Sequence, residues 1–396
     1  MTAKMMGDRV GLLTGVRVLE VATVISGPYA GMVLSDYGAE VTKIEPPGGD
    51  PFRYWGGTAQ VRSSHFEALN RGKKSIALDL KSDDGRRVFL DMCADADVVL
   101  ENFRPGALDR LGLGYEVLRL RNPRLVYCGV SGMGLFGPDV RKPAYDAVVQ
   151  AKSGFWSQLT SLDDPEAIGP PIIDQVTGLF AAYAVASALV NRNVTGTGSR
   201  VSVSMLEAAL AFQPLAVAEY LDNGTKPDAY SRAHYSQSYG FVTSDGKPVA
   251  VHMSSRSKFW LGLTKALGRE ELATDPRFST PEGRIKNYDL LRVTLAEEFG
   301  RRSRAAVLES LYEHDVPCSP INDIAEALSD PQVGALGIVR EFDAASDEGT
   351  ARYVVAPGTA DEGERRAVAP DYNADAAAIL GRLGYPEPEI ARLLKD

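Results

Sequence analysis

The sequence predicts an α/β fold, with a mostly parallel sheet in a large domain and a smaller α+β domain after it. The first third of the chain alternates short strand-like runs with amphipathic helical runs, the pattern of βαβ units whose helices cover both faces of a sheet. From about residue 225 the pattern changes to a hairpin followed by several helices. The tail returns to one strand-like and one helix-like run, so we expect it to pack back on the large domain.

Each element of the large domain follows from a local signal. Aliphatic and β-branched runs predict strands at Val16–Ala22, Ala39–Glu45, Ser75–Leu80, Asp97–Phe103, Arg124–Ser131 and Ser199–Met205. Apolar residues at helical spacing predict helices at Pro28–Gly38, Asp83–Ala94, Ala107–Arg121, the stretch after Asp174, and Leu206–Asp222. The first helix starts with proline and ends with glycine, as helix termini prefer.

The smaller domain has its own signals. The segment Tyr239–Met253 predicts a hairpin that turns at Ser244–Asp245–Gly246. Helical patterns follow at Ser257–Leu267, Tyr288–Phe299 and Ser303–His314. We therefore expect a large domain at 1–215 and 330–396, a small domain at 225–325, and linkers at 216–224 and 326–329.

The composition excludes several classes of function. The 396-residue chain is 44% hydrophobic with a formal net charge of −9, so neither nucleic acid nor an anionic membrane is an expected partner. The apolar run Leu179–Val190 is too short to span a bilayer and predicts a buried core helix. Residues 1–15 hold no signal-peptide stretch and the three cysteines are far apart, so we expect a cytoplasmic protein. Four scattered histidines predict no metal site.

Two glycine-containing motifs carry little weight. Gly132–Gly137 matches G-x-G-x-x-G after a strand, but Pro138 follows and no helix begins there, which disfavours a nicotinamide or flavin site. A flexible backbone loop near a ligand is the better interpretation. Gly129–Met133 misses the G-x-S-x-G nucleophile elbow because Met133 replaces the second glycine. No G-x-x-x-x-G-K-[ST] motif is present, which disfavours a P-loop ATPase.

Asp174 stands just before the apolar helical run and allows two interpretations. Aspartate is a preferred N-cap residue, so a purely structural role is the simpler one. A carboxylate at a helix N-terminus with apolar surroundings can also be held ionised yet poorly hydrated, which suits a nucleophile. Composition and spacing do not choose between these interpretations.

Ordered blocks of sequence extend over nearly the whole chain. They include RVLEVATVISGPYAGMVLSDYGAEVTKIEPPGGDPFR, NRGKKSIALDLKSDDGRRVFLDMCADADVVLENFRPGALDRLGLGYEVL, VSGMGLFGP, AYDAVVQAKSG, DQVTGLFAAYAVASALVNRNVTGTGSRVSVSMLEAAL and DVPCSPINDIAEALSDPQV. Together they resemble the family III coenzyme A transferases, the group that includes formyl-CoA transferase, the carnitine CoA-transferase type and α-methylacyl-CoA racemase. The resemblance implies a Rossmann-like large domain and an interlocked homodimer, with each active site between the large domain of one subunit and the small domain of its partner.

The resemblance also implies a role for Asp174. In this family the catalytic aspartate lies in a D-x-x-(S/T)-G block that opens the central helix, here Asp174–Gly178. Its carboxylate attacks an acyl-CoA thioester, which forms a mixed anhydride and releases CoA thiolate. The thiolate returns to give an aspartyl-CoA thioester and frees the donor acid, and an acceptor carboxylate then repeats the sequence in reverse. The implied substrates are an acyl-CoA and a small carboxylic acid, with no permanently bound cofactor and no metal.

Tyr145 separates the transferases from the racemases of this family. The racemases carry a histidine in a G-H-D triplet where this chain has Ala144–Tyr145–Asp146. A phenol with a pKa near 10 is a poor partner for two-base proton exchange, and transferases carry tyrosine with an acidic neighbour there. The resemblance thus adds Tyr145 and Asp146 to the catalytic candidates. A 2-methylacyl-CoA racemase or epimerase and a non-catalytic CoA-binding protein are the alternatives.

The remaining site residues carry over from the family by position. The predicted CoA contacts are Val24, Ile25, Ser26, Lys73, Lys74, Asn102, Phe103, Arg110 and Lys142. The predicted substrate lid, Ser231–Gly240, carries His234, Tyr235 and Gln237 in place of a glycine run. Ile25 and Pro46 replace a glutamine and an arginine of formyl-CoA transferase, which disfavours an oxalate/formate enzyme.

Overall fold

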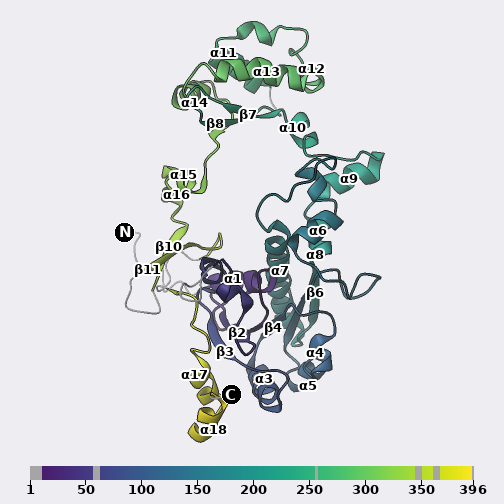
Figure 1. The fold of residues 1–396 in the computed structure, drawn as a ribbon, viewed down its shortest axis with the longest axis vertical. Helices are drawn as coiled ribbons and strands as arrows, with labels where there is room; N and C mark the ends of the chain where they lie inside the picture. Colours follow the sequence, from purple (N-terminus) through teal and green to yellow (C-terminus); the bar gives the residue numbers. More distant parts are fainter. Residues whose placement is uncertain (1–10, 57–62, 255–256, 344–349, 360–365, 395–396) are drawn as a thin grey trace. The chain divides into compact units, whose positions relative to one another are not determined.

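The computed structural model describes residues 11–56, 63–254, 257–343, 350–359 and 366–394, and the chain forms two compact units (Figure 1). Unit 1 comprises Met1–Trp156, Ala167–Pro214 and Gly337–Asp396, and unit 2 comprises Ser157–Glu166 and Leu215–Leu336. The segments 216–224 and 326–329, predicted as linkers, are largely helical and group with unit 2.

Six parallel strands form the centre of unit 1. They are β1 Arg17–Val21, β2 Glu40–Glu45, β3 Lys74–Ala77, β4 Val98–Glu101, β5 Val126–Ser131 and β6 Arg200–Ser204. Their order is β3-β2-β1-β4-β5-β6, with parallel pairing throughout. This is the Rossmann strand order, in which the direction of winding reverses between β1 and β4. The prediction of an α/β fold with a parallel sheet is confirmed.

Helices cover both faces of this sheet, as the alternation of buried strand residues requires (Figure 1). The helices of unit 1 are α1 Ser26–Asp36, α2 Ser64–Asn70, α3 Asp83–Asp95, α4 Ala107–Arg110, α5 Tyr115–Arg121, α6 Asp146–Lys152, α7 Ile172–Thr195, α8 Met205–Ala211, α17 Ala376–Arg382 and α18 Glu387–Leu393. On one face Val18 and Leu100 pack with α1 and α7, and on the other Leu19 and Val99 pack with α3, α5 and α17.

Two predicted helices are each divided in the structure. The run Ala107–Arg121 forms α4 and α5, because Gly112 has a φ of 72° that a helix does not accommodate. The run Leu206–Asp222 forms α8 and α9 (Pro214–Asn223), because Pro214 lacks the N–H that would continue the helix.

The central helix α7 is longer than the sequence prediction. Its 24 residues have a mean hydropathy of 1.5 over the most apolar window, so by length and composition alone α7 could cross a membrane. However, 56% of that window is buried inside the fold, where α7 packs against the sheet and α1. The expectation that this segment is a core helix is confirmed, although the argument from its shortness is wrong.

Unit 2 has a three-stranded sheet and its own hydrophobic core. Its strands are β7 Ser238–Val242, β8 Pro248–His252 and β9 Cys318–Pro320, and its larger helices are α9, α10 Ser231–Ser236, α11 Ser257–Leu267, α12 Pro281–Lys286, α13 Tyr288–Phe299, α14 Arg304–Glu313, α15 Ile324–Leu328 and α16 Pro331–Leu336. β7 and β8 pair antiparallel on either side of the turn at Ser244–Gly246, so the predicted hairpin is confirmed.

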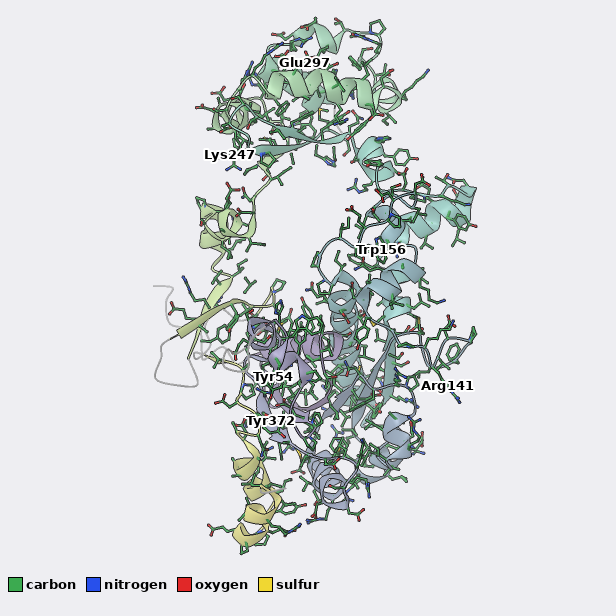
Figure 2. The ribbon with its side chains drawn as sticks, in the orientation of Figure 1. Tyr54, Arg141, Trp156, Lys247, Glu297 and Tyr372 are labelled. Carbon is green, nitrogen blue, oxygen red and sulfur yellow. The ribbon has the colours of Figure 1, made fainter. Side chains whose placement is uncertain are left out.

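The C-terminal segment packs back on unit 1, as predicted. β10 Val339–Asp343, β11 Thr350–Val354 and β12 Arg366–Ala367 form a small sheet of their own. Beyond it, Asp375 Oδ2 accepts the N–H of Ser75 at 2.8 Å on edge strand β3. Tyr372 and Tyr54 lie side by side, with their hydroxyls near the backbone of Gly48 (Figure 2). This docking fixes the loop after β2, which holds Asp50.

Candidate active site

Asp174 lies in the first turn of α7, where another carboxylate caps the backbone. α7 begins at Ile172, and its N-cap residue Pro171 makes no side-chain hydrogen bond. Asp146 Oδ1 instead accepts the N–H groups of Ile173 at 2.7 Å and Asp174 at 3.0 Å. The interpretation of Asp174 as the N-cap is therefore wrong, because the helix begins before it and Asp146 supplies the cap. The Asp174 carboxylate is left to face the pocket.

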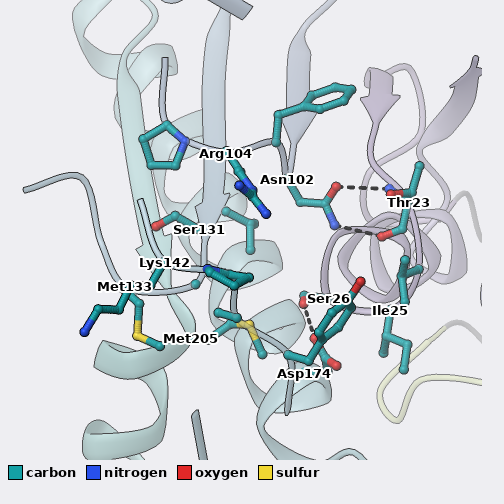
Figure 3. A pocket seen from close by; sticks show the side chains of 18 of the residues that line it. Thr23, Ile25, Ser26, Asn102, Arg104, Ser131, Met133, Lys142, Asp174 and Met205 are labelled. Atoms are coloured by element: carbon teal, nitrogen blue, oxygen red, sulfur yellow. Dashed lines mark hydrogen bonds between the residues drawn. The ribbon is translucent and has the colours of Figure 1, made fainter. Parts of the chain in front are cut away.

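Ser26, the first residue of α1, holds one oxygen of that carboxylate. Its Oγ donates a hydrogen bond to Asp174 Oδ1 (Figure 3). The two helices approach this closely because Gly178 faces α1 one turn further along α7. A Cβ at Gly178 would lie 2.7 Å from the Ser26 carbonyl oxygen and 3.0 Å from Tyr29. Within the described part of the chain no donor hydrogen-bonds to the other carboxylate oxygen, Oδ2.

The surroundings of Asp174 disfavour its charged form. The residue is 8% exposed, and burial raises the pKa of its carboxyl to about 6. The Ser26 hydrogen bond lowers this pKa, while the negative charge of Asp146 raises it. At neutral pH the carboxylate is thus ionised but poorly solvated, which makes it a better nucleophile than an exposed one.

A pocket of about 230 Å³ opens in front of Asp174, where the strand order reverses between β1 and β4. Loops after neighbouring strands diverge at such a point, and open α/β sheets bind their ligands there. The lining residues come from β5, from the loops after β1, β4 and β5, and from three helices: Thr23–Ser26, Asn102–Pro105, Val130–Met133, Val140, Lys142–Tyr145, Asp174 and Met205. The predicted residues Val24, Ile25, Asn102 and Phe103 are among them (Figure 3).

The loop after β1 has a strained backbone that side chains hold in place. Val24 has a φ of 68°, a conformation that β-branched residues rarely adopt. Asn102 binds the preceding residue through both amide atoms, accepting the Thr23 N–H at 3.0 Å and donating to the Thr23 carbonyl at 2.8 Å (Figure 3). The Val24 N–H lies 3.4 Å from Asp50 Oδ1. Asn102 therefore shapes the pocket wall as well as lining it.

Asp50 belongs to a network of buried charges beneath this loop. Lys43 Nζ lies 2.8 Å from Asp50 Oδ2 and 3.1 Å from Glu20 Oε1. Lys73 Nζ lies 2.7 Å from Glu20 Oε2, so two cations balance two carboxylates. Burial alone would lower the pKa of Lys43, but the charges of Glu20 and Asp50 outweigh it and raise that pKa.

The structure corrects the prediction for Lys73. Its side chain is fully buried, and its ammonium also donates to the Pro28 carbonyl and to Asn70 Oδ1, each at 2.9 Å. Burial, only partly offset by Glu20, lowers the pKa of Lys73 to about 8. Lys73 is therefore a structural residue in this arrangement and does not present its charge to a ligand.

Lys74 and Arg110 do not line the pocket either. Lys74 begins β3, and its Nζ pairs with Glu40 at 3.0 Å. Arg110 is exposed at the end of α4. The structure brings neither residue together with Asp174, and their predicted contact with CoA stays a prediction.

The segment before α6 supplies the opposite wall of the pocket. Tyr145 lines it and is 69% exposed, whereas its neighbour Asp146 caps α7 and does not line it. Of the two predicted catalytic candidates, Tyr145 therefore lies in the pocket, whereas Asp146 positions α7. Lys142 also lines the pocket, with its Nζ 2.7 Å from Asp139 Oδ1.

The predicted lid residues belong to unit 2, and the first of them lie in a helix rather than a loop. His234 and Tyr235 are in α10. The His234 ring packs on Tyr288 with 4.2 Å between ring centroids, and Tyr235 is 55% exposed.

The structure also corrects the prediction that Gln237 is a lid residue facing the substrate. It is 1% exposed, and its Oε1 accepts a hydrogen bond from Arg284 Nε at 2.6 Å inside unit 2. A buried amide that pairs with a buried guanidinium stabilises the fold of this unit, so Gln237 does not present itself to a substrate.

The pocket also contains residues that sequence reasoning missed. Arg104 is exposed beside Asn102 and Phe103, and Ser131, Met133 and Met205 complete the lining (Figure 3). Arg104 lies in the same ENFRPG stretch that identified its neighbours, so a signal for it was present. Met205 follows β6, and only the sheet topology brings it to this pocket.

The groups that line the pocket suit carboxylate chemistry. Among the described residues, no group of three or more His, Cys, Asp or Glu side chains could hold a metal ion. The pocket offers one buried carboxylate, one hydroxyl on it, and cationic side chains near its entrance.

The profile of CoA-transferase family III matches residues 13–376. The chain belongs to this family. Acetyl-CoA:oxalate CoA-transferase from Acetobacter aceti is 38% identical over 329 residues, covering 82% of this chain and 84% of that relative. Succinate–glutarate CoA-transferase from Agrobacterium fabrum is 34% identical over 356 residues, covering 87% and 88%. The crystal structure of a CAIB/BAIF family protein from Brucella suis has a TM-score of 0.83 and 33% identity, covering 95% of this chain and 100% of that one.

These similarities confirm the family and the enzyme class inferred from sequence motifs. As a family III CoA-transferase, the chain uses CoA thioesters as substrates. Its parallel sheet and accompanying small sheets match the architecture of the CAIB/BAIF protein.

Proposed function

We propose that this family III CoA-transferase moves CoA from an acyl-CoA donor to a free carboxylic acid through covalent intermediates on Asp174. The observation that carries the proposal is the Asp174 carboxylate itself. It lines the switch-point pocket, it is buried without a cation, and its Oδ2 makes no hydrogen bond within the described part of the chain. Such an oxygen is the nucleophile that thioester exchange requires.

The proposed reaction balances without water or ATP. Asp174 Oδ2 attacks the thioester carbonyl, the C–S bond breaks, and CoA leaves as a thiolate from a mixed anhydride. The thiolate then attacks Cγ of Asp174, which releases the donor acid and leaves an aspartyl-CoA thioester. The acceptor carboxylate attacks the same Cγ and expels the thiolate, which finally attacks the acyl carbon of the new anhydride. New acyl-CoA leaves, and the Asp174 carboxylate is regenerated.

The pocket walls support a proposal for how CoA lies in the site. Val24, Ile25 and Phe103 supply apolar surface for the pantetheine arm near Asp174. Arg104 and Lys142 supply positive charge for the CoA phosphates. Because Lys142 is paired with Asp139 and Arg104 makes no ion pair among the described residues, Arg104 is the more available cation.

We propose a dicarboxylic acid as the acceptor class. The two relatives named above act, by their names, on oxalate and on glutarate with acetyl-CoA or succinate as the other partner. Succinyl-CoA and acetyl-CoA are therefore the donors to try first.

We also propose that the enzyme is a homodimer. An apolar groove of about 550 Å³ lies on unit 1 between α7, β6 and α8, and it includes Phe180 and Tyr183, which are 37% and 72% exposed. Exposed apolar surface of this kind marks an interface in many soluble proteins. Sedimentation velocity that shows a monomer at micromolar concentration would refute this part of the proposal.

The decisive experiment is intact-protein and peptide mass spectrometry after incubation with succinyl-CoA or acetyl-CoA. We expect a CoA adduct on the peptide that contains Asp174, and new acyl-CoA when a dicarboxylic acid is added. Asp174→Ala should abolish both. CoA binding without adduct or turnover would favour a non-catalytic binding protein. Deuterium wash-in at the α-carbon of a 2-methylacyl-CoA without any acceptor acid would favour a racemase.

A further inference from the structure

Ser26 occupies a position that the first step of the reaction does not explain. Its hydroxyl donates to Asp174 Oδ1, and this hydrogen bond stabilises the carboxylate and weakens it as a nucleophile. The attacking oxygen in the first step is Oδ2, to which Ser26 makes no hydrogen bond. The hydroxyl therefore needs a role in the later steps, when Asp174 is no longer a free carboxylate.

We propose that Ser26 is a catalytic residue for the two steps in which Cγ of Asp174 is attacked, an inference that rests on the proposed function. Once Oδ2 has bonded to the acyl group, Oδ1 is the carbonyl oxygen of the anhydride. When CoA thiolate attacks Cγ, the carbonyl π pair moves onto Oδ1, and the Ser26 hydroxyl donates to this oxyanion. The pair then returns, the Cγ–Oδ2 bond breaks, and the donor acid leaves as a carboxylate.

The same geometry serves the second attack. The aspartyl-CoA thioester keeps a single carbonyl oxygen beside Ser26, and the acceptor carboxylate adds to Cγ with negative charge again on that oxygen. The thiolate then leaves as the C–S bond breaks. Ser26 keeps its proton throughout, so no base is needed, and the hydrogen bond only strengthens as charge develops.

The donor is held in place before the reaction, as oxyanion stabilisation requires. Ser26 is 6% exposed and begins α1 directly after the strained loop. On that loop Asn102 binds Thr23 through two hydrogen bonds, and Asp50 lies within 3.4 Å of the Val24 N–H. A loop whose backbone is held by side-chain hydrogen bonds at two successive residues places the hydroxyl without reorganisation when the charge appears.

The test separates the two halves of the reaction in Ser26→Ala at pH 8, well above the pKa of about 6 of the Asp174 carboxyl. In single-turnover experiments with succinyl-CoA and no acceptor, released thiol reports the first attack and the CoA adduct on Asp174 reports the second. We expect Ser26→Ala to release up to one equivalent of CoA thiol per site while it forms the adduct on the order of 10²-fold more slowly than the parent enzyme. Ser26→Thr, which keeps a hydroxyl, should restore adduct formation.

Two outcomes would overturn the role of Ser26 and leave the proposed function intact. Adduct formation by Ser26→Ala at the parent rate overturns it, and so does an equal loss of thiol release and adduct, because the hydroxyl would then act only on the free carboxylate. Ser26→Cys, similar in volume but a weaker donor, supplies the same comparison if the alanine variant folds poorly. If the parent enzyme itself forms no adduct on Asp174, the proposed function fails, and the role of Ser26 fails with it.

Discussion

Two neighbouring regions of unit 1 that bury charge differ in one respect, because only one of them provides a countercharge. In the network of Glu20, Lys43, Asp50 and Lys73, two cations balance two carboxylates at distances of 2.7 to 3.1 Å. At Asp174 a single carboxylate is buried against a hydroxyl, and the nearest acidic group, Asp146, adds repulsion. The paired network holds the fold together, whereas the unpaired carboxylate is kept at a cost in stability that its proposed role as the nucleophile would explain.

The two regions are physically connected. Asp50 pairs with Lys43 on one side and lies against the Val24 N–H on the other, so the balanced network supports the loop that carries Ser26 to Asp174. A charge network that is fully paired can hold a strained backbone in place, and the strained backbone in turn places the reactive group. We therefore expect that removing a charge from the paired network lowers the free energy of unfolding, whereas removing the charge of Asp174 raises it.

The largest expected effect follows from removing the cation of the paired network. Lys43→Met leaves Asp50 buried without its cation and leaves Glu20 with Lys73 alone, so we expect a loss of about 3–5 kcal/mol in the free energy of unfolding. Urea denaturation followed by circular dichroism measures it. The matched control is Lys74→Met, since Lys74 pairs with Glu40 at the surface and should change stability by less than about 1 kcal/mol. Equal effects of the two substitutions would contradict the comparison.

Removing the unpaired charge of Asp174 should raise the free energy of unfolding. The pKa of Asp174 rises from 3.8 to about 6 on folding, so the folded state binds more protons than the unfolded state between these pH values, and ionisation destabilises it above pH 6. We expect Asp174→Asn to raise the free energy of unfolding by about 1–3 kcal/mol at pH 7.5, and this increase should disappear as the pH falls below 4. Chemical denaturation at both pH values tests this sign.

Asp50→Asn is the control for that measurement, because it also neutralises a buried aspartate. Asp50 is paired with Lys43, so its loss should destabilise the protein at pH 7.5. Both substitutions should lower transfer activity, Asp174→Asn because it removes the proposed nucleophile and Asp50→Asn because it loosens the loop at Val24. A stabilised Asp50→Asn, or a destabilised Asp174→Asn, would show that the two regions do not differ as described.

The pH dependence of transfer should follow the unpaired carboxylate. Because Asp174 must be ionised to attack, we expect kcat/KM to fall tenfold per pH unit below about pH 6 and to level off above pH 7. The groups that face it are Ser26 and Asp146, with Tyr145 and Lys142 on the pocket wall. A rate constant that stays level down to pH 5, with an acceptor acid of low pKa, would refute Asp174 as the titrating group.

The sequence predicted the position of Asp174 better than its surroundings. A motif can mark a nucleophile and the loops after β1 and β4, because these depend on local sequence and on the order of strands. The burial of Lys73 could not be predicted this way, since Glu20 lies on another strand, and nothing in the pair Lys73–Lys74 says which ammonium turns inward. Gln237 is a similar case, because its partner Arg284 is distant in sequence.

The N-cap of α7 also could not be predicted from the sequence. Sequence patterns place an N-cap next to the helix, whereas Asp146 reaches the first turn of α7 from another helix, α6. The two helix breaks were also missed, because both runs were predicted as single helices, but their causes, Gly112 and Pro214, are local in the sequence. Element boundaries therefore depend on signals that the sequence contains, while partners of buried polar groups require the tertiary structure.

The smallest predicted effect tests whether Asp146 acts on Asp174 through its charge as well as through the cap. Asp146→Asn keeps an oxygen for the N–H groups of Ile173 and Asp174, and it removes the negative charge that raises the pKa of Asp174. Burial is the larger cause of that pKa, so we expect the acid limb of kcat/KM to move to lower pH by only about 0.5 units, with stability nearly unchanged.

Asp146→Ala distinguishes the charge from the cap, because it removes both. It should move the acid limb in the same direction and also lower the free energy of unfolding by about 1 kcal/mol, the usual cost of an N-cap. If Asp146→Asn leaves the acid limb in place, the carboxylate is purely a cap. The raised pKa of Asp174 would then come from burial alone. In that case the two regions would differ because Asp174 is desolvated without a cation, and repulsion between two carboxylates would play no part.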